Sequence, residues 1–173
     1  MITYNMNIST IKYFSTVNGD GFRTAVFVSG CRLHCKGCFN YEAWDFSHGV
    51  KLIDEIIDKI LKSIEPEYIK GLSILGGEPL DENNVEGVKN LVNKFREKFG
   101  NTKTIWIWSG YTFEELIKYK EKKDILNNCD VLVDGPFKID LYDAKLAFRG
   151  SSNQRIIDLR NSTNSNPKIL DID

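Results

Sequence analysis

Residues 22–40 read FRTAVFVSGCRLHCKGCFN, a run of strand-forming residues that leads directly into three closely spaced cysteines. The first eight positions are rich in β-branched and aromatic side chains, so they predict a strand. Cys31, Cys35 and Cys38 follow within eight positions, and the only other cysteine, Cys129, lies much further along the chain. Because thiolates are strong ligands for soft metals, the segment predicts a metal site in the loop after the strand.

The same order of elements, a strand, a glycine-containing turn and a helix, recurs further along the chain. Apolar residues at helical spacing predict amphipathic helices over 51–64 and 85–99, and Thr112 with Glu115 has the spacing of a capping box that opens another helix. Strands that alternate with helices indicate an α/β fold with a mainly parallel sheet and right-handed crossovers. Short apolar runs predict strands at 22–29, 72–75, 104–108, 131–133 and 155–159.

Glycine-containing segments directly follow four of these predicted strands. In folds of this kind, ligands bind at the carboxyl ends of the parallel strands. We therefore expect four loops to gather on one rim of an open or partial (β/α) barrel. The four segments are 31–38, 76–78, 109–110 and 134–135.

The overall composition is that of one ordinary globular domain. The 173 residues include 42% hydrophobic and 27% charged side chains, enough to build a core without disulfides. A formal net charge of -1 argues against nucleic acid as a main partner. The sequence shows neither a signal-peptide pattern nor a long apolar run, so we expect no membrane contact and a cytoplasmic location. In that reducing compartment, clustered cysteines serve metal binding more often than disulfides.

Three clustered cysteines leave open what provides the fourth ligand of a metal site. A structural zinc site needs four cysteine or histidine ligands, so His34, His48 or Cys129 would have to complete it. A [4Fe-4S] cluster ordinarily takes one thiolate on each iron, and three thiolates would leave one iron open to a substrate or cofactor. Gly30 and Gly37 would let the loop wrap closely round a bulky cluster. The residues favour a cluster with an open iron over zinc.

The cysteines and a second motif together resemble the radical S-adenosylmethionine (SAM) superfamily. The resemblance rests on Cys-x3-Cys-x2-Cys after a strand, an aromatic residue directly after the third cysteine, and GGEP after the second predicted strand. It implies that SAM chelates the open iron of a [4Fe-4S] cluster held by Cys31, Cys35 and Cys38. The residues that it implies in SAM binding are Gly37, Cys38 and Phe39 beside the adenine, and Gly76, Gly77 and Glu78 beside the methionine amino group.

Six segments narrow the resemblance to one family, the activating proteins of anaerobic (class III) ribonucleoside-triphosphate reductase. They span about residues 17–155, and they imply a partial, open (β/α) barrel of the abbreviated radical SAM type. We expect one radical SAM domain over 1–173, with a core of about 17–160 and a tail of about 162–173 that has no assigned function. The segments are VNGDGFRTAVFVSGC, GCFN, LGGEPL, IWIWSGYT, VLVDGPF and FRGSSNQR.

The resemblance also implies a reaction and its partners. A one-electron donor such as flavodoxin would reduce the cluster, and reductive cleavage of SAM would give methionine and a 5'-deoxyadenosyl radical. That radical would take the α-hydrogen of a glycine near the C-terminus of the reductase, with which a stable complex is expected. Because the cofactors carry this chemistry, we expect no catalytic acid, base or nucleophile from the protein.

Two other functions fit parts of the sequence. A short radical SAM enzyme of the deazapurine-pathway synthase type would act on a small molecule, but it would need substrate-binding residues around a closed rim, and none is identified. A non-catalytic iron-sulfur or zinc module would need only the cysteines. The sequence assigns no single role to Asp134 or to 149–153, and it favours core packing over partner docking for Trp106 and Trp108.

Overall fold

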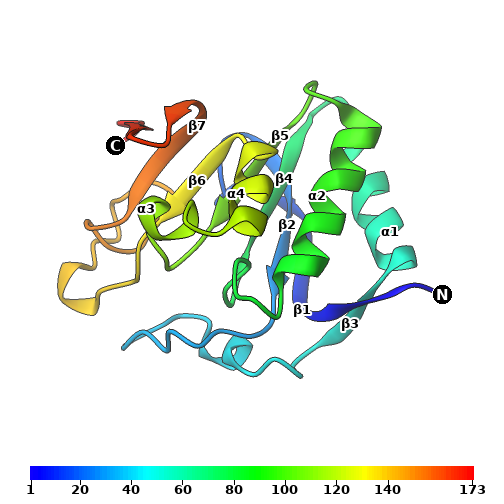
Figure 1. Cartoon of the computed structure of the whole chain (residues 1–173), viewed down its shortest axis with the longest axis horizontal. Coiled ribbons are helices and arrows are strands. Elements are labelled where there is room, and N and C mark those ends of the chain that lie inside the picture. The colour runs from blue at the N-terminus through cyan, green and yellow to red at the C-terminus, as the bar shows by residue number, and fades with distance from the viewer.

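A computed structural model describes residues 1–173 as one eight-stranded sheet with helices packed against it (Figure 1). The strands run across the sheet in the order β3-β1-β2-β4-β5-β6-β7-β8. Because β3 and β8 are free edges, the sheet is open and does not close into a barrel. The strands are β1 (Thr3–Ser15), β2 (Phe22–Val28), β3 (Val50–Ile53), β4 (Ile69–Gly76), β5 (Thr104–Trp108), β6 (Val131–Asp134), β7 (Arg155–Thr163) and β8 (Asn166–Ile169).

The four central strands, β2, β4, β5 and β6, are parallel, as the alternation of strands and helices predicts. The flanking strands β1, β3, β7 and β8 pair antiparallel. The prediction of a mainly parallel sheet is therefore correct for the centre and wrong for the flanks. Two flanking pairs, β1 with β2 and β7 with β8, are joined by short connections, which can link only antiparallel strands.

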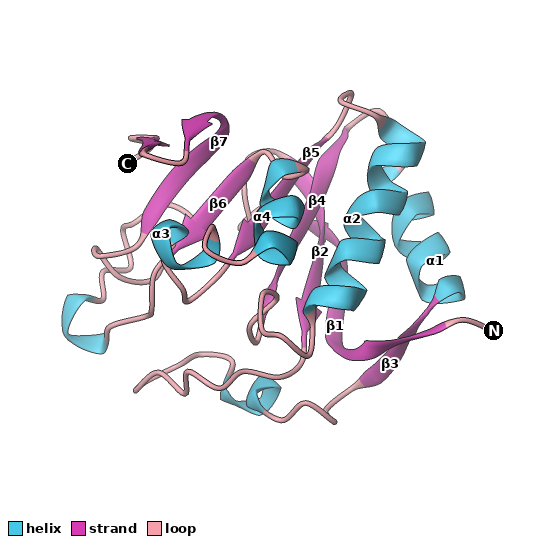
Figure 2. Cartoon of the chain, in the orientation of Figure 1, coloured by secondary structure: helices cyan, strands magenta, loops and turns pink.

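The α-helices cover one face of the sheet, as the cyan ribbons of Figure 2 show. The helix predicted over 85–99 is confirmed, whereas the pattern over 51–64 divides into the end of β3 and the helix α1. Thr112 and Glu115 form the predicted capping box, with each side chain accepting a hydrogen bond from the backbone N–H of the other. None of the helices is long and apolar enough to span a membrane. The helices are α1 (Asp54–Ile64), α2 (Val85–Phe99), α3 (Phe113–Leu116) and α4 (Lys120–Asn127), with 3-10 helices at Tyr41–Trp44 and Ile139–Leu141.

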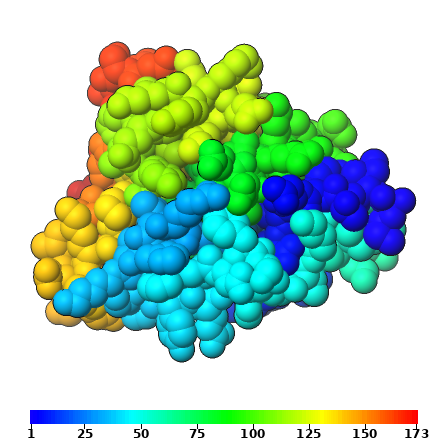
Figure 3. All heavy atoms as spheres, turned by 60° about the horizontal axis from the view of Figure 1, so that its bottom comes forward, coloured from blue at the N-terminus to red at the C-terminus, as the bar shows by residue number.

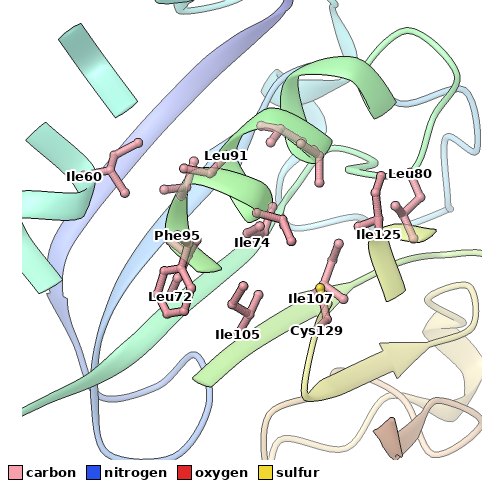
Figure 4. Packing of buried hydrophobic residues seen from close by; sticks show 14 of the residues in the cluster. Ile60, Leu72, Ile74, Leu80, Leu91, Phe95, Ile105, Ile107, Ile125 and Cys129 are labelled. Atoms are coloured by element: carbon pink, nitrogen blue, oxygen red, sulfur yellow. The ribbon is translucent and has the colours of Figure 1, made fainter. Parts of the chain in front are cut away.

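The main hydrophobic core lies between the helices and the sheet (Figure 4). Alternate side chains of a strand point to the same face, so Leu72 and Ile74 of β4 both enter this core. Leu91 and Phe95 of α2 pack against them, and both are fully buried. Cys129 belongs to the same cluster and is 3% exposed, so it is a buried core side chain.

The opposite face of the sheet carries a much smaller cluster of four buried residues. Trp106 is 4% exposed there, which confirms its predicted packing role. Trp108 is half-buried beside it, and its indole N–H donates to the carbonyl oxygen of Phe148 at 2.8 Å. This sparsely filled face leaves space for a cavity next to the carboxyl ends of the parallel strands.

Arg23 lies fully buried at the start of β2 and ties three strands together. Its guanidinium donates to the carbonyl oxygens of Leu72 and Thr104, each at 2.9 Å, and to the Ser73 hydroxyl at 2.8 Å. Burial lowers the pKa of Arg23 to about 10, so the side chain is still charged at pH 7. We predict that Arg23→Ala lowers the free energy of unfolding by about 3–5 kcal/mol, because it leaves buried acceptors without a donor. Chemical denaturation measures this change.

Arg160→Ala is the matched control for that measurement. Arg160 pairs with Asp130 but is partly exposed, and Arg96 also pairs with Asp130. Losing such a pair is expected to cost under about 1 kcal/mol. Equal losses for the two variants would show that the buried network of Arg23 does not stabilise the sheet.

Candidate functional site

Loops at the carboxyl ends of the parallel strands surround one cavity of about 490 Å³. The loop after β2 contributes the clustered cysteines, and the loops after β4, β5 and β6 contribute 76–78, 109–110 and Gly135. The predicted gathering of four loops on one rim is therefore confirmed. The volume lies in the range typical of sites for small ligands and cofactors.

Cys31, Cys35 and Cys38 all line this cavity. Cys31 is buried, at 8% exposed, and the other two thiols are half-buried. The cysteine loop, residues 30–38, is fixed to the 3-10 helix that follows it by two backbone hydrogen bonds. Burial raises the pKa of Cys31 to about 11 and also raises that of Cys35. Their thiolates therefore form when a bound metal supplies positive charge.

The side chains considered as a fourth ligand do not reach the cavity. His34 is exposed and stacks on Trp44 with ring centroids 4.3 Å apart, and Cys129 lies in the core. His48 is also absent from the cavity lining. No group of three or more His, Cys, Asp or Glu side chains converges on one point, as a single zinc ion requires. Cluster thiolates bind separate irons, so three thiols that line one cavity suit a [4Fe-4S] cluster with one open iron.

The glycines of the GGEP turn are required by backbone packing. A Cβ on Gly76, where φ is +110°, would lie 2.6 Å from the amide nitrogen of Val28. A Cβ on Gly77 would lie 2.5 Å from the carbonyl oxygen of Gly30. The backbone N–H groups of Gly77 and Glu78 donate to the carbonyl oxygens of Val28 and Gly30, both at 2.8 Å. The GGEP turn thus rests directly on the entry to the cysteine loop.

Glu78 joins the loops after β4 and β5 through its carboxylate, which is almost fully buried. Oε1 accepts hydrogen bonds from the Leu80 N–H at 2.9 Å and the Ser109 hydroxyl at 2.8 Å, and Oε2 accepts one from the Gly110 N–H at 2.7 Å. Burial raises the pKa of Glu78 to about 7, and these hydrogen bonds oppose the rise. Glu78 also lines the cavity, so a titratable carboxylate and the three thiols line the same cavity.

Known proteins are similar to this chain over most of its length. A family described as a 4Fe-4S single cluster domain matches residues 17–157. Three relatives bear the name anaerobic ribonucleoside-triphosphate reductase-activating protein. The Haemophilus influenzae protein is 39% identical, and the match covers 84% of this chain and 95% of the relative. The Vibrio cholerae protein is 40% identical, with 87% of this chain and 97% of the relative covered. The Escherichia coli K12 protein is 39% identical, with 90% of this chain and 100% of the relative covered. The chain belongs to this family of activating proteins.

One wall of the cavity in this activating protein comes from a segment to which the sequence assigns no site role. The rim segment, residues 136–150 between β6 and β7, lines the cavity with Tyr142 and Phe148 among others. The Phe39 ring lies 5.4 Å from that of Phe137 and 5.7 Å from that of Tyr142, measured between centroids. Figure 3 shows the light-blue cysteine region against this yellow-to-orange segment. Phe39 therefore joins the cysteine loop to the rim segment.

Asp134 is a structural residue of the activating protein. It is 1% exposed, and its carboxylate accepts a hydrogen bond from the Phe113 N–H at 2.7 Å and pairs with Arg155. It does not line the cavity. The sequence assigns Asp134 no single role, and the geometry supports a structural one.

The polar run FRGSSNQR, residues 148–155, fixes the rim segment by hydrogen bonds. The Ser151 hydroxyl accepts from the Lys138 N–H at 3.1 Å, and the Asn153 amide donates to the carbonyl oxygen of Pro136 at 2.8 Å. Arg149 is the charged member of the run that lines the cavity. The unusual polar density of this run, visible in the sequence, thus reflects the fixing of a loop.

Proposed function

We propose that this protein activates an anaerobic ribonucleoside-triphosphate reductase by generating a glycyl radical on it. The observation that carries the proposal is the convergence of Cys-x3-Cys-x2-Cys and the GGEP turn on one cavity at the carboxyl ends of parallel strands. The names of the relatives support the same activity and the same protein substrate. The protein is accordingly an enzyme, a glycyl-radical activase.

In this proposal Cys31, Cys35 and Cys38 hold a [4Fe-4S] cluster and leave its fourth iron for SAM. The donor set supports the assignment, because three soft thiols face a cavity that no other cysteine or histidine lines. When bound, the cluster and SAM would supply cleavage of SAM to methionine and a 5'-deoxyadenosyl radical with one electron from an external donor, and that radical would take the α-hydrogen of a glycine in the reductase. The residues of the chain bind, orient and shield these groups.

We assign the methionine end of SAM to Gly76, Gly77 and Glu78, and the adenine end to 37–39. Both segments line the cavity, apart from Gly37, whose φ of +76° gives the cysteine loop its turn. The Glu78 carboxylate is a suitable acceptor for the N–H groups of the SAM amino group, and the Phe39 ring offers an apolar face to a base. These contacts would orient SAM between the two motifs.

The raised pKa of Glu78 predicts a pH dependence of SAM binding. As pH falls through about 7, the carboxyl group gains a proton and loses its attraction for the amino group of SAM. The KM for SAM is therefore expected to rise by about tenfold from pH 8 to pH 6, where about one carboxyl in ten remains ionised. Initial rates of 5'-deoxyadenosine formation measure this, with iron content checked at each pH. Glu78→Gln should show a weaker pH dependence, and an unchanged profile would remove Glu78 from this role.

We also propose that the open sheet is a form of the abbreviated radical SAM barrel and that 1–173 is a single domain. One continuous eight-stranded sheet supports this view. The segment after 162 is part of that sheet, because β8 pairs with β7. The proposed core of about 17–160 includes every residue that lines the cavity.

The proposed partners are the reductase, in a stable complex, and a one-electron donor of the flavodoxin type, all in the cytoplasm. A protein substrate needs access to the cavity from outside. The open sheet and the exposed side chains of the rim segment, such as Ile139 and Tyr142, support such access. Copurification of the two proteins tests the stable complex.

Anaerobic reconstitution tests the chemistry. Protein loaded with iron and sulfide, then given dithionite and SAM, is expected to release methionine and 5'-deoxyadenosine in equal amounts, as measured by chromatography. Protein without iron is the control. A loaded protein that forms a cluster yet releases no 5'-deoxyadenosine would rule out the proposed radical reaction.

A further inference from the structure

Asn84 occupies the N-cap position of α2, yet its side chain does not cap that helix. Asparagine is preferred at this position because its side-chain oxygen accepts a hydrogen bond from the first turn. Here the Asn84 amide nitrogen instead donates to the carbonyl oxygens of Ser29 at 3.0 Å and Glu78 at 2.9 Å, with a longer contact of 3.4 Å to Gly30. Asn84 is 1% exposed, so this buried amide is committed to two loops of the site.

The loops that Asn84 joins are the two that carry the site motifs. Ser29 and Gly30 immediately precede Cys31, and Glu78 is the acidic residue of the GGEP turn. Carbonyl oxygens can be met only by a donor, so the amide nitrogen must face them. Neither serine nor aspartate can replace this contact, because serine is too short to span both loops and ionised aspartate has no donor.

Asp81, from the segment that also contains Asn84, contacts the residue on the C-terminal side of Cys31. Asp81 is buried and pairs with Arg32, the residue directly after Cys31. The segment that follows the GGEP turn therefore contacts the chain on both sides of Cys31, through Asn84 before it and Asp81 after it. Backbone hydrogen bonds from the GGEP turn to Val28 and Gly30 join the same two parts of the chain.

We propose that Asn84 is a positioning residue of the activation reaction, which sets the separation between the cysteine loop and the GGEP turn. This inference rests on the proposed function, in which SAM touches the open iron on one side and the GGEP turn on the other. A ligand that bridges two loops depends on their spacing, and small misplacements of reacting groups slow a reaction strongly. Residues that orient metal ligands without binding the metal typically change metal affinity or activity by about 10- to 100-fold when they are replaced.

Substitutions at Asn84 separate positioning from helix capping. Serine and aspartate are as good as asparagine at an N-cap, so a capping residue would tolerate both. A positioning residue would tolerate neither. For Asn84→Ser and Asn84→Asp we expect the KM for SAM to rise by about 10- to 100-fold, with iron content close to that of the unmodified protein. The midpoint of thermal unfolding should fall by only a few degrees, because buried carbonyl oxygens lose a donor while the fold is kept. Adding SAM changes the electron paramagnetic resonance spectrum of the reduced cluster when SAM binds the open iron. We expect this change to differ between the Asn84 variants and the unmodified protein.

Asn83→Ser is the matched control. Asn83 is the adjacent residue, and its side-chain amide joins neither the cysteine loop nor the GGEP turn. It should leave the KM for SAM and the spectrum unchanged. Normal SAM kinetics and spectra in both Asn84 variants would overturn the inference, and so would variants that lose fold and cluster together, because Asn84 would then serve stability. If the unmodified protein in the same preparation failed to cleave SAM, the proposed function itself would fail.

Discussion

Replacing Cys31, Cys35 or Cys38 by alanine is expected to abolish the [4Fe-4S] cluster and SAM cleavage together. In the proposed site each thiolate would hold a different iron, and no other cysteine or histidine lines the cavity to take its place. Iron and sulfide content after anaerobic reconstitution should fall well below that of the unmodified protein, and 5'-deoxyadenosine should fall to the background of the assay. Both quantities are measured on the same samples.

Cys129→Ala is the control for these three variants. Cys129 lies in the core, and burial raises its pKa to about 12, so it remains a neutral thiol rather than a metal ligand. We expect a full cluster, normal SAM cleavage and a loss of about 1 kcal/mol in the free energy of unfolding. If Cys129→Ala folded normally but lost its cluster, a site with four protein thiolates would replace the one described.

Gly77→Ala is expected to reduce SAM cleavage by about 100-fold or more. The added methyl carbon would lie 2.5 Å from the carbonyl oxygen of Gly30 and 2.9 Å from that of Ala43. Neither atom belongs to a flexible side chain, so the GGEP turn and the cysteine loop must separate. A displacement of this size between two loops that hold one ligand is enough for such a loss. The rate of 5'-deoxyadenosine formation at saturating SAM measures it.

Gly100→Ala provides the comparison for a glycine outside the site. Gly100 follows α2 with φ of +54°, and a Cβ there would meet nothing within 4 Å. The strained backbone should lower the free energy of unfolding by about 1 kcal/mol while SAM cleavage remains unchanged. Equal activity in the two variants would show that contact between the GGEP turn and the cysteine loop is not required.

The sequence predicted the parts of the fold that depend on local patterns. The apolar stripe over 85–99 became α2, and glycine-containing segments after four strands became the loops around one cavity. These predictions succeed because the carboxyl ends of parallel strands lie on one edge of a sheet whatever the details of the loops. The first strand was not predicted, although Tyr4, Met6 and Ile8 alternate along it and are all buried.

Other features of the site depend on contacts between distant segments, which no local pattern encodes. The sequence indicated Glu78 as a ligand-binding residue, but not that its carboxylate is already held by the Ser109 hydroxyl and the Gly110 N–H. Asn84 carries the ordinary signature of an N-cap, and only the folded chain shows its amide turned toward the cysteine loop. The rim segment likewise becomes a cavity wall only after β6 and β7 pair.

Electron paramagnetic resonance of a reductase treated with this protein tests the proposed activation directly. Reconstituted activator, SAM, a reductant and an anaerobic ribonucleoside-triphosphate reductase are combined without oxygen. We predict a glycyl-radical doublet that is absent when the activator carries Cys38→Ala, and absent when the radical-bearing glycine of the reductase is replaced by alanine. SAM cleavage without any doublet on the reductase would rule out the proposed activation and assign the radical to another substrate.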